Sequence, residues 1–199
     1  MSDNLSPINM QIGLFFGSFN PIHFGHLAIA NYLVEFSELE QVWFVVSPHN
    51  PFKNKSHLLG EYHRLELVNR AIDDDQSFRA SSIEFNLPKP SYTIDTITYL
   101  KEQYPMHDFR MIMGMDQLAS FHKWKNSDEL REQIGFQVYP RPGCDRHELL
   151  DTPEFELVEA PLMEISSSFI RHSIREGKNI SYFLHPAVWT YISEVGVYS

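Results

Sequence analysis

The sequence has few cysteines and few basic residues, and each shortage argues against a class of protein. Cys144 is its only cysteine, which excludes a disulfide framework and a cysteine-based zinc cluster and favours a reducing compartment. The 16 Lys and Arg stand against 26 Asp and Glu, a formal net charge of -10. This balance argues against broad binding to nucleic acid or to an anionic membrane surface. An anionic ligand would need a local cluster of positive groups.

Long apolar runs are also missing. No apolar stretch approaches the length of a membrane span, and the N-terminal residues lack the basic and apolar segments of a signal peptide. We therefore expect a cytoplasmic protein with no membrane partner. The 199 residues, 43% of them hydrophobic, suffice for a substantial core, and we see no linker, repeat or low-complexity tract. We expect one domain over residues 1–199, with a small C-terminal helical part at about 162–199.

Short apolar runs alternate with segments of helical periodicity along the chain. Strands are predicted at 10–16, 41–47, 78–85, 109–114, 136–139 and 155–160. Helices are predicted at 27–36, 62–72, 93–104, 127–133, 167–176 and 186–195. This order predicts an α/β fold, in which helices cover both faces of a doubly wound parallel sheet. The apolar runs IGLFF and MIMG are typical of central strands.

The stretch GLFFGSFNPIHFGH, residues 13–26, joins the first predicted strand to a helix that starts near Gly25. A helix that begins at a strand end offers free backbone N–H groups and the positive end of its dipole to an anion. His23 and His26 lie three residues apart across the first helical turn, so both can point N–H groups at one phosphate. The alternative is a simple connection whose histidines cap the helix or face solvent. A Walker A loop and a GxGxxG fingerprint are both absent here.

Three serines, at positions 166–168, stand at the start of the helix predicted at 167–176, within the stretch EISSSFIRHSIREGK. Serine is a favoured N-cap residue, and its hydroxyl together with free backbone amides can equally hold phosphate oxygens. Arg171 follows in the first turn or so and would present a planar fork of donors that lysine cannot copy. Taken alone, this pattern fits either a helix cap or an anion site.

Together, the two motifs resemble the nucleotidyltransferase superfamily related to class I aminoacyl-tRNA synthetases. The first matches the signature GxFxPxHxGH at Gly17, Phe19, Pro21, His23, Gly25 and His26. The second is similar to ISSTxIR, with Ser168 in place of threonine. PSYTIDTITYL (90–100), MGMDQLASFHKW (113–124) and RPG (141–143) are similar to stretches of bacterial nicotinate mononucleotide adenylyltransferases. The resemblance thus spans essentially the whole chain.

The resemblance implies a Rossmann-like sheet and transfer of AMP from ATP to nicotinate mononucleotide, which yields nicotinate adenine dinucleotide and pyrophosphate in NAD biosynthesis. The implied catalytic residues are His23 and His26. The implied ATP-binding residues are Gly17, Ser18, Phe19, His23, Gly25, His26, Gly114, Asp116, Ile165, Ser167, Ser168 and Arg171. The implied substrate-binding residues are Lys53, Tyr92, Thr93 and Trp124. We expect Mg²⁺ to arrive with ATP, without a dedicated metal site.

Three sets of residues in these stretches also have a plain structural interpretation. Trp124 either stacks on a pyridine ring or packs on a neighbouring loop. Ser91 and Thr93 either frame free amides that hold a carboxylate or simply cap a helix. Asp116 either contacts the nucleotide, as in the resembled family, or is an ordinary N-cap.

One segment departs from the family pattern. Where PPHK is common, this chain has PHNPFKNK, so Phe52 stands at the position of the expected histidine, and His49 is a candidate substitute. Two rival functions remain. One is another adenylyltransferase of the superfamily, such as pantetheine-phosphate adenylyltransferase, which has no evident use for the SYT and FHKW stretches. The other is a nucleotide-binding module without catalysis. The sequence leaves the oligomeric state open, a homo-oligomer included.

Overall fold

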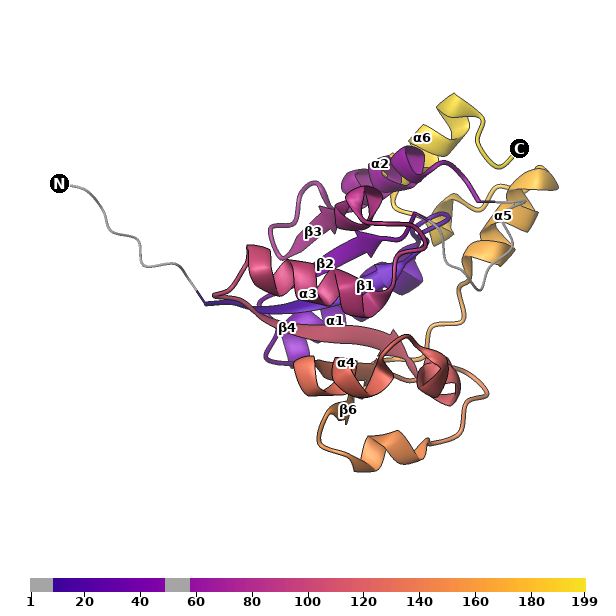
Figure 1. Cartoon of the computed structure of the whole chain (residues 1–199). Coiled ribbons are helices and arrows are strands. Elements are labelled where there is room, and N and C mark those ends of the chain that lie inside the picture. The colour runs from indigo at the N-terminus through magenta and orange to yellow at the C-terminus, as the bar shows by residue number, and fades with distance from the viewer. Residues whose placement is uncertain (1–8, 49–57) are drawn as a thin grey trace.

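A parallel sheet forms the centre of the fold (Figure 1). The computed structural model describes residues 9–48 and 58–199. Within these residues the 6-stranded sheet has the order β3-β2-β1-β4-β5-β6. Its strands are β1 (Gln11–Gly17), β2 (Gln41–Val46), β3 (Phe78–Ser81), β4 (Asp108–Gly114), β5 (Gly135–Tyr139) and β6 (Phe155–Leu157). The predicted doubly wound α/β fold is confirmed.

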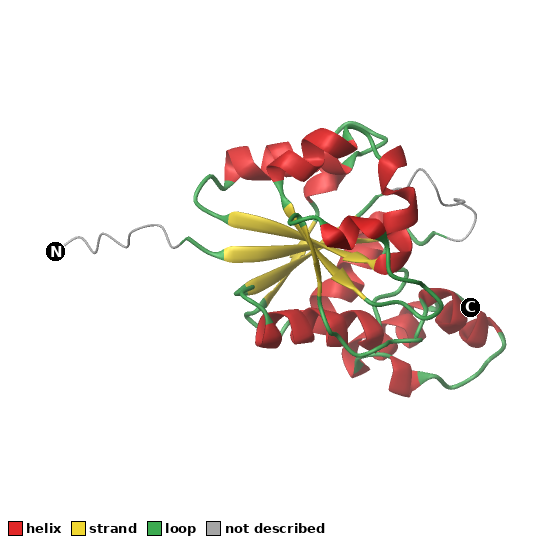
Figure 2. Cartoon of the chain, turned by 90° about the horizontal axis from the view of Figure 1, so that it is seen from below, coloured by secondary structure: helices red, strands yellow, loops and turns green. Residues whose placement is uncertain are grey.

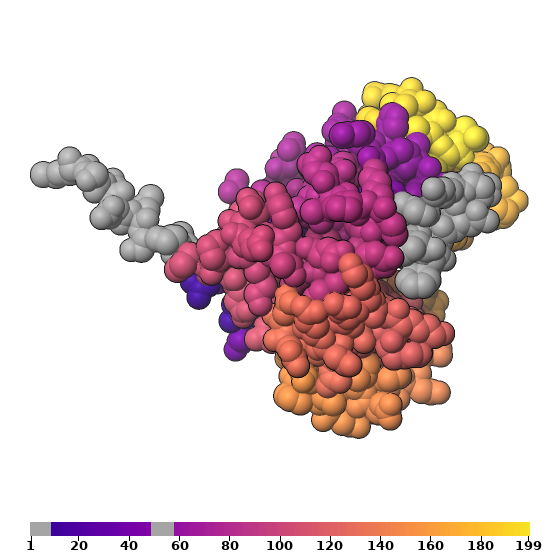
Figure 3. All heavy atoms as spheres, viewed as in Figure 1, coloured from indigo at the N-terminus to yellow at the C-terminus, as the bar shows by residue number. Residues whose placement is uncertain are grey.

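Helices cover both faces of the sheet, as Figure 2 shows. The α-helices are α1 (Phe24–Phe36), α2 (Glu61–Ile72), α3 (Thr93–Gln103), α4 (Ser127–Gln133), α5 (Ser167–Arg175) and α6 (Pro186–Val195). Shorter 3₁₀ helices are η2 (Ile83–Asn86), η3 (Met115–Lys123), η4 (Glu148–Asp151) and η5 (Ser181–Phe183). The space-filling view shows the yellow C-terminal helical part packed against the purple surface of α2 (Figure 3).

Alternating side chains along the central strands create two cores. Ile12 and Leu14 of β1 point to the face that carries α3, η3 and α4, where they pack in one buried cluster with Leu100 and Phe121. Phe15 points to the opposite face and packs in a second cluster with side chains of α1, α2, α5 and α6. Both faces of β1 are covered, which explains its apolar sequence. The last two helices share a core with β1 and β2.

Two predicted strands are too long. The strand predicted at 78–85 ends at Ser81, and η2 follows because Glu84 turns inward, 3% exposed, and accepts hydrogen bonds from Ser91 and Thr96. The strand predicted at 155–160 ends at Leu157, which pairs with Val138 near the end of β5, and the Val158 N–H makes one further bond to the Val138 carbonyl at 2.9 Å.

The segment after β4 forms a helix that the sequence analysis did not predict. Within η3 the buried residues are Met115, Leu118 and Phe121, three positions apart each time. A 3₁₀ helix has three residues per turn, so this spacing places all three side chains on one face. A search for the 3.6-residue period of an α-helix overlooks such a segment. The helix leads the chain from the carboxyl end of β4 to Trp124.

A buried arginine ties together the loops at the carboxyl edge of the sheet. Arg64 of α2 is 0% exposed. Its Nη1 donates hydrogen bonds to the carbonyls of Ser18, at 2.6 Å, and Ser47, at 2.8 Å. Its Nε donates to the Leu59 carbonyl at 2.8 Å, and its Nη2 to the Pro48 carbonyl at 3.1 Å. One guanidinium thus joins the connections that follow β1 and β2 to the segment that enters α2.

Arginine suits this position because its planar fork carries five N–H donors that can serve several carbonyls at once. Burial lowers the pKa of Arg64 from its ordinary value, while Tyr198 and Glu61 act in the opposite direction. Removal of the guanidinium would leave buried carbonyl groups without a partner, each at a cost of about 1–3 kcal/mol.

We expect Arg64→Met to lower the free energy of unfolding by about 3–5 kcal/mol, because it leaves several buried carbonyl groups unpaired. The matched control is Arg70→Met in the same helix, where Arg70 forms an exposed ion pair with Glu66. The control should cost about 1 kcal/mol or less. Urea denaturation of both variants measures the difference. Equal losses would show that Arg64 contributes no more than a surface arginine.

Candidate active site

The connection from β1 to α1, residues 17–26, is termed here the β1–α1 corner. Phe19 adopts a left-handed backbone with φ 42. Its ring is 2% exposed and packs edge-on against Phe15, Phe44 and His26. A Cβ at Gly17 would lie 2.7 Å from the Phe19 ring, so only glycine permits this packing. Because its ring is buried, Phe19 can contact a nucleotide only through its backbone.

His23 and His26 begin helix α1 together. Their rings are stacked, with centroids 3.7 Å apart and an interplanar angle of 23°. The backbone N–H of His23 donates to Nδ1 of His26 at 3.3 Å. His26 therefore helps to cap the helix, which was one of the alternatives in the sequence analysis. Because Nδ1 accepts this bond, the proton of the neutral ring is on Nε2. A Cβ at Gly25 would lie 3.0 Å from Nδ1 of His23, so glycine keeps room for the stacked rings.

The His23 side chain is uncharged at neutral pH. It is 4% exposed, and burial, together with the positive charge of Arg141, lowers its pKa from 6.5 to about 3. The His23 side chain faces the backbone N–H of His26 in a capping box, but among the described residues its buried Nδ1 makes no well-formed hydrogen bond. An unpaired buried polar atom is costly unless a ligand or water completes it. His23 therefore offers a neutral imidazole to a ligand in the β1–α1 corner.

The start of α5 lies directly against this corner. The hydroxyl of Ser167 donates to the carbonyl of Pro21 at 2.9 Å, and Nη1 of Arg171 donates to the carbonyl of Asn20 at 2.8 Å. Ile165 packs beside Gly25, where an added Cβ would lie 3.5 Å from its own Cβ. The first turns of α1 and α5, 146 residues apart along the chain at Ser167 and Pro21, are therefore neighbours.

Each helix start leaves backbone donors for an anion. The first amides of a helix have no acceptor within it, and the helix dipole adds positive potential at the same place. The hydroxyl of Ser166 accepts from the N–H of Phe169 at 3.2 Å, which caps α5. Because the Ser167 hydroxyl is bound to the Pro21 carbonyl, Ser167 would contact a phosphate through its backbone N–H. The exposed Ser168 hydroxyl accepts from Nη2 of Arg171 at 3.2 Å.

The end of β4 carries the expected Gly114 and Asp116. Asp116 forms an ion pair with Arg141, with 3.4 Å between Oδ1 and Nε. The N-cap of η3 is Gly114, and no side-chain cap bond is formed there, so the N-cap interpretation of Asp116 is wrong. A Cβ at Gly114 would lie 2.4 Å from Asp116 Oδ1 and 3.2 Å from Tyr139. Glycine thus allows both side chains to close over the strand end.

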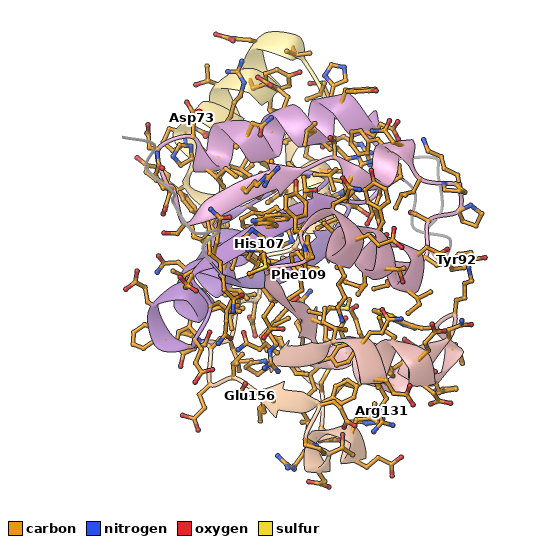
Figure 4. All side chains as sticks on the ribbon, turned by 60° about the vertical axis from the view of Figure 1, so that its left-hand side comes forward. Asp73, Tyr92, His107, Phe109, Arg131 and Glu156 are labelled. Atoms are coloured by element: carbon orange, nitrogen blue, oxygen red, sulfur yellow. The ribbon has the colours of Figure 1, made fainter. Side chains whose placement is uncertain are left out.

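The SYT and FHKW stretches meet at the start of α3. Lys125 forms an ion pair with Asp95 of α3, with 2.9 Å between Nζ and Oδ2, and its Nζ lies 4.6 Å from the centre of the Tyr92 ring. Trp124, next to Lys125, is half-buried and packs at a tilt on Phe121, with ring centroids 5.4 Å apart. Figure 4 places Tyr92 far from Asp73 and His107, which lie toward the opposite edge of the sheet.

Ser91 and Thr93 do not cap α3 with their side chains, so that interpretation is wrong. The N-cap is Tyr92, without a side-chain cap bond. The hydroxyl of Ser91 instead donates to the buried carboxylate of Glu84 at 3.3 Å, and Thr96 donates to the same group at 3.0 Å. The SYTxxT spacing therefore anchors the start of α3 on Glu84.

Some expected features lie elsewhere. Lys53, Phe52 and His49 fall outside the described residues. In the part of the chain that the structure describes, no group of 3 or more His, Cys, Asp or Glu is placed to hold a metal ion. No helix within the same residues is long and apolar enough to cross a bilayer. An open surface hollow lined by Gln41 and Phe78, among others, lies at the amino-terminal edge of the sheet, away from these motifs.

Three charged residues of this region were missed in the sequence analysis. Arg64 occupies the buried face of α2, at the spacing of Leu67 and Val68, so an arginine on an apolar face was a usable signal. Arg141 follows β5 after Pro140, at the carboxyl edge where ligands collect in such sheets; the RPG stretch at 141–143 was noted in the sequence analysis, but no role was given to its arginine. Glu84 gave no local signal, because its apolar neighbours alternate as they would in a strand.

Comparisons with known proteins agree with this geometry. The cytidylyltransferase-like family profile matches residues 14–173. A curated relative from Christiangramia forsetii, named probable nicotinate-nucleotide adenylyltransferase, is 51% identical over 193 residues, with 96% of this chain and 100% of the relative covered. A relative of the same name from Bacteroides fragilis is 49% identical over 179 residues, with 90% and 89% covered.

A solved structure extends the likeness to the fold. The nicotinic acid mononucleotide adenylyltransferase of Plasmodium falciparum, complexed with NaAD, superposes with a TM-score of 0.78 at 20% identity, covering 96% of this chain and 98% of that one. At this identity the likeness concerns the fold. The level of identity to the curated relatives, over nearly their full length, settles the family. The chain belongs to the cytidylyltransferase-like family and, within it, to the nicotinate-nucleotide adenylyltransferases.

Proposed function

We propose that this protein transfers AMP from ATP to nicotinate mononucleotide, releasing pyrophosphate and forming nicotinate adenine dinucleotide for NAD biosynthesis. The observation that carries the proposal is the junction of two helix starts, in which Ser167 and Arg171 of α5 bind the carbonyls of Pro21 and Asn20. A triphosphate can span such a junction, since each helix start offers amides and positive potential. The names of relatives about half identical to this chain support the same activity.

In the reaction, an oxygen of the 5′-phosphate of the mononucleotide bonds to the α-phosphorus of ATP. The bond from that phosphorus to the oxygen that bridges to the β-phosphorus breaks, and its electron pair leaves with pyrophosphate. Negative charge grows on the α-phosphate oxygens, so preorganised donors stabilise the transition state more than the ground state. No covalent enzyme intermediate is required, and positioning supplies much of the remaining effect.

We assign the α-phosphate to His23 and His26. The Nε2–H of His26 is a donor because Nδ1 is bound to the backbone N–H of His23. The imidazole of His23 is neutral, so it acts through a hydrogen bond and not through a full charge. Stacking of the two rings orients both toward the same place.

The leaving pyrophosphate is assigned to the start of α5. Arg171 and the amides of Ser167 and Ser168 would hold its oxygens. Gly17, Ser18, Gly25, Ile165, Gly114 and Asp116 would form the remaining ATP contacts. Mg²⁺ would enter as part of the ATP substrate, with phosphates and waters as its ligands. The β1–α1 corner offers mainly imidazole and amide nitrogens, which suit phosphate oxygens. The metal would therefore be bound by the phosphates of ATP.

The mononucleotide is assigned to the region between Trp124 and α3. The exposed part of Trp124 would stack on the pyridine ring, and the first amides of α3, at Tyr92 and Thr93, would hold its carboxylate. Lys53 remains a predicted substrate-binding residue that would help to gather the anionic substrates.

The wider expectations also remain proposals. We propose residues 1–199 as one domain, since the C-terminal helical part at 162–199 shares a core with β1 and β2. A cytoplasmic location remains a prediction from the composition. The oligomeric state remains open.

The substrate assignment is tested by pyrophosphate release with ATP and, separately, nicotinate mononucleotide, nicotinamide mononucleotide and phosphopantetheine. We expect turnover with the nicotinate compound, because Trp124 and the amides of α3 suit an aromatic acid. Turnover with phosphopantetheine alone would favour the rival adenylyltransferase. ATP binding without any pyrophosphate release would indicate a binding module.

We expect His26→Ala to lower kcat by a factor of about 100 or more, as for the loss of a preorganised donor. It should also destabilise the protein by about 1 kcal/mol, because the N–H of His23 loses its acceptor. His26→Asn is the matched control: it keeps an acceptor near the Nδ1 position but cannot reach the Nε2 position. Steady-state kinetics and urea denaturation should show lost activity in both variants and lost stability mainly in the first. Near-normal turnover in either variant would contradict the assigned role.

We expect the His23 imidazole to stay neutral from pH 8 down to pH 5, since its pKa is about 3 in the folded protein. The unfolded imidazole, with a pKa of about 6.5, takes up a proton below that pH. His23 therefore costs stability as the pH falls from 6.5 toward 3. The Cε1–H resonance in NMR spectra reports the titration, with free imidazole as the internal reference. A midpoint near that of the reference would rule out the neutral, buried state.

A further inference from the structure

The segment after α6 returns to the β1–α1 corner. Helix α6 ends at Gly196, which adopts the left-handed φ of 71 that favours glycine. Two residues later the Tyr198 hydroxyl donates to Oδ1 of Asn20 at 2.8 Å, across 178 residues of sequence. Figure 1 shows this end of the chain on the side of the molecule toward which β4 points. Tyr198 thus lies at the carboxyl edge of the sheet.

Asn20 connects several segments of the candidate active site. Its side chain, in a residue 6% exposed, accepts both the Tyr198 hydroxyl and the backbone N–H of Leu59, the latter at 3.2 Å. Its carbonyl accepts Nη1 of Arg171 at 2.8 Å. Asn20 lies three residues before His23 in the sequence. The orientation of this one residue therefore influences both the histidine pair and the guanidinium assigned to pyrophosphate.

The environment of Tyr198 keeps its hydroxyl a donor. Burial raises its pKa, and the nearby guanidinium groups of Arg171 and Arg64 only partly oppose that effect. The ring packs against the core cluster that contains Phe15 and side chains of α5 and α6. Tyr198 therefore lies near both arginines that bind backbone carbonyls of the β1–α1 corner.

The backbone of Tyr198 is strained. Its φ is 70, a left-handed conformation that costs a bulky residue of this kind free energy and persists only where surrounding contacts enforce it. The contacts that enforce it are the ring packing and the bond to Asn20. Such strain is common at functional sites, and it fits a residue whose hydroxyl has to reach one particular acceptor.

We propose that Tyr198 is a positioning residue for ATP: through Asn20 it holds the carbonyl that orients Arg171, and so sets the distance between the starts of α1 and α5. The inference rests on the proposed function, because it assumes that a triphosphate spans those two helix starts. It assigns to the segment after α6 an indirect role in nucleotide binding, through Asn20 and Arg171. Tyr198 acts on the triphosphate end of the site and leaves the mononucleotide end unaffected.

The test compares Tyr198→Phe with Tyr191→Phe. Both substitutions remove one phenolic hydrogen bond from the same C-terminal region, since the Tyr191 hydroxyl pairs with Nδ1 of His63 on α2 at 2.7 Å. Tyr191 is the matched control because its bond leads away from the β1–α1 corner. The probe is an ATP analogue with a methylene bridge between its α- and β-phosphorus atoms, and its affinity is measured by calorimetry with Mg²⁺ present.

For Tyr198→Phe we expect about five- to tenfold weaker binding of the analogue, as for the loss of one hydrogen bond. In turnover assays, KM for ATP should rise by a similar factor, while KM for nicotinate mononucleotide changes less than about twofold. Tyr191→Phe should change neither constant, although the urea midpoints of both variants fall slightly. In an Asn20→Ala background, Tyr198→Phe should have no further effect on ATP binding, since the two residues act through one bond.

Unchanged analogue affinity in Tyr198→Phe, with a urea midpoint like that of Tyr191→Phe, would overturn the inference and leave Tyr198 a purely structural residue. So would an equal rise of KM for both substrates. The proposed function fails separately, if the unsubstituted protein binds the analogue but releases no pyrophosphate with nicotinate mononucleotide. In that case the binding comparison still decides whether Tyr198 positions the nucleotide.

Discussion

The buried guanidinium of Arg64 is the constraint on which the candidate active site depends. It binds carbonyls of Ser18, Ser47, Pro48 and Leu59, so the connections after β1 and β2 and the entry to α2 cannot move independently. Ser18 immediately precedes Phe19, whose left-handed backbone turns the chain toward the histidine pair. A lysine, with one compact ammonium group, could not reach acceptors in so many directions. The position of the histidines is thus decided by a residue outside the motif that contains them.

A second constraint is electrostatic. Two helix starts point their positive ends at the same space, and Arg171 and Arg141 add full charges nearby, although the whole protein carries a net charge of -10. Positive ends of this kind repel each other until an anion lies between them. The hydrogen bonds from α5 to Pro21 and Asn20 offset that repulsion and keep the two helices together. An anionic nucleotide then meets a positive site that is already assembled, within a protein that otherwise repels it.

Much of this arrangement followed from sequence, because apolar strands, helical periods and helix starts are local patterns. The doubly wound parallel sheet could be predicted from them, although the strand order was not, and the resemblance to the nucleotidyltransferase superfamily implied that His23, His26, Ser167 and Arg171 bind one nucleotide. The buried polar groups could not. Arg64 stood out only as an arginine on the apolar face of α2, and its carbonyl partners lie in other segments; Glu84, which accepts from the hydroxyls of Ser91 and Thr96, gave no local signal at all. The short strand β3 was predicted too long for the same reason, since Glu84 turns inward and η2 begins where the strand was predicted to continue.

The bonds from α5 to the β1–α1 corner have a consequence for the order in which the protein acquires its structure during synthesis. They join residues 146 and 151 positions apart, and Asn20 also binds a residue 178 positions later. Closing such long loops is entropically costly and comes late. On the ribosome, the strands and their crossover helices can assemble while α5 is still untranslated. A nascent chain would therefore complete its sheet well before it could hold a triphosphate.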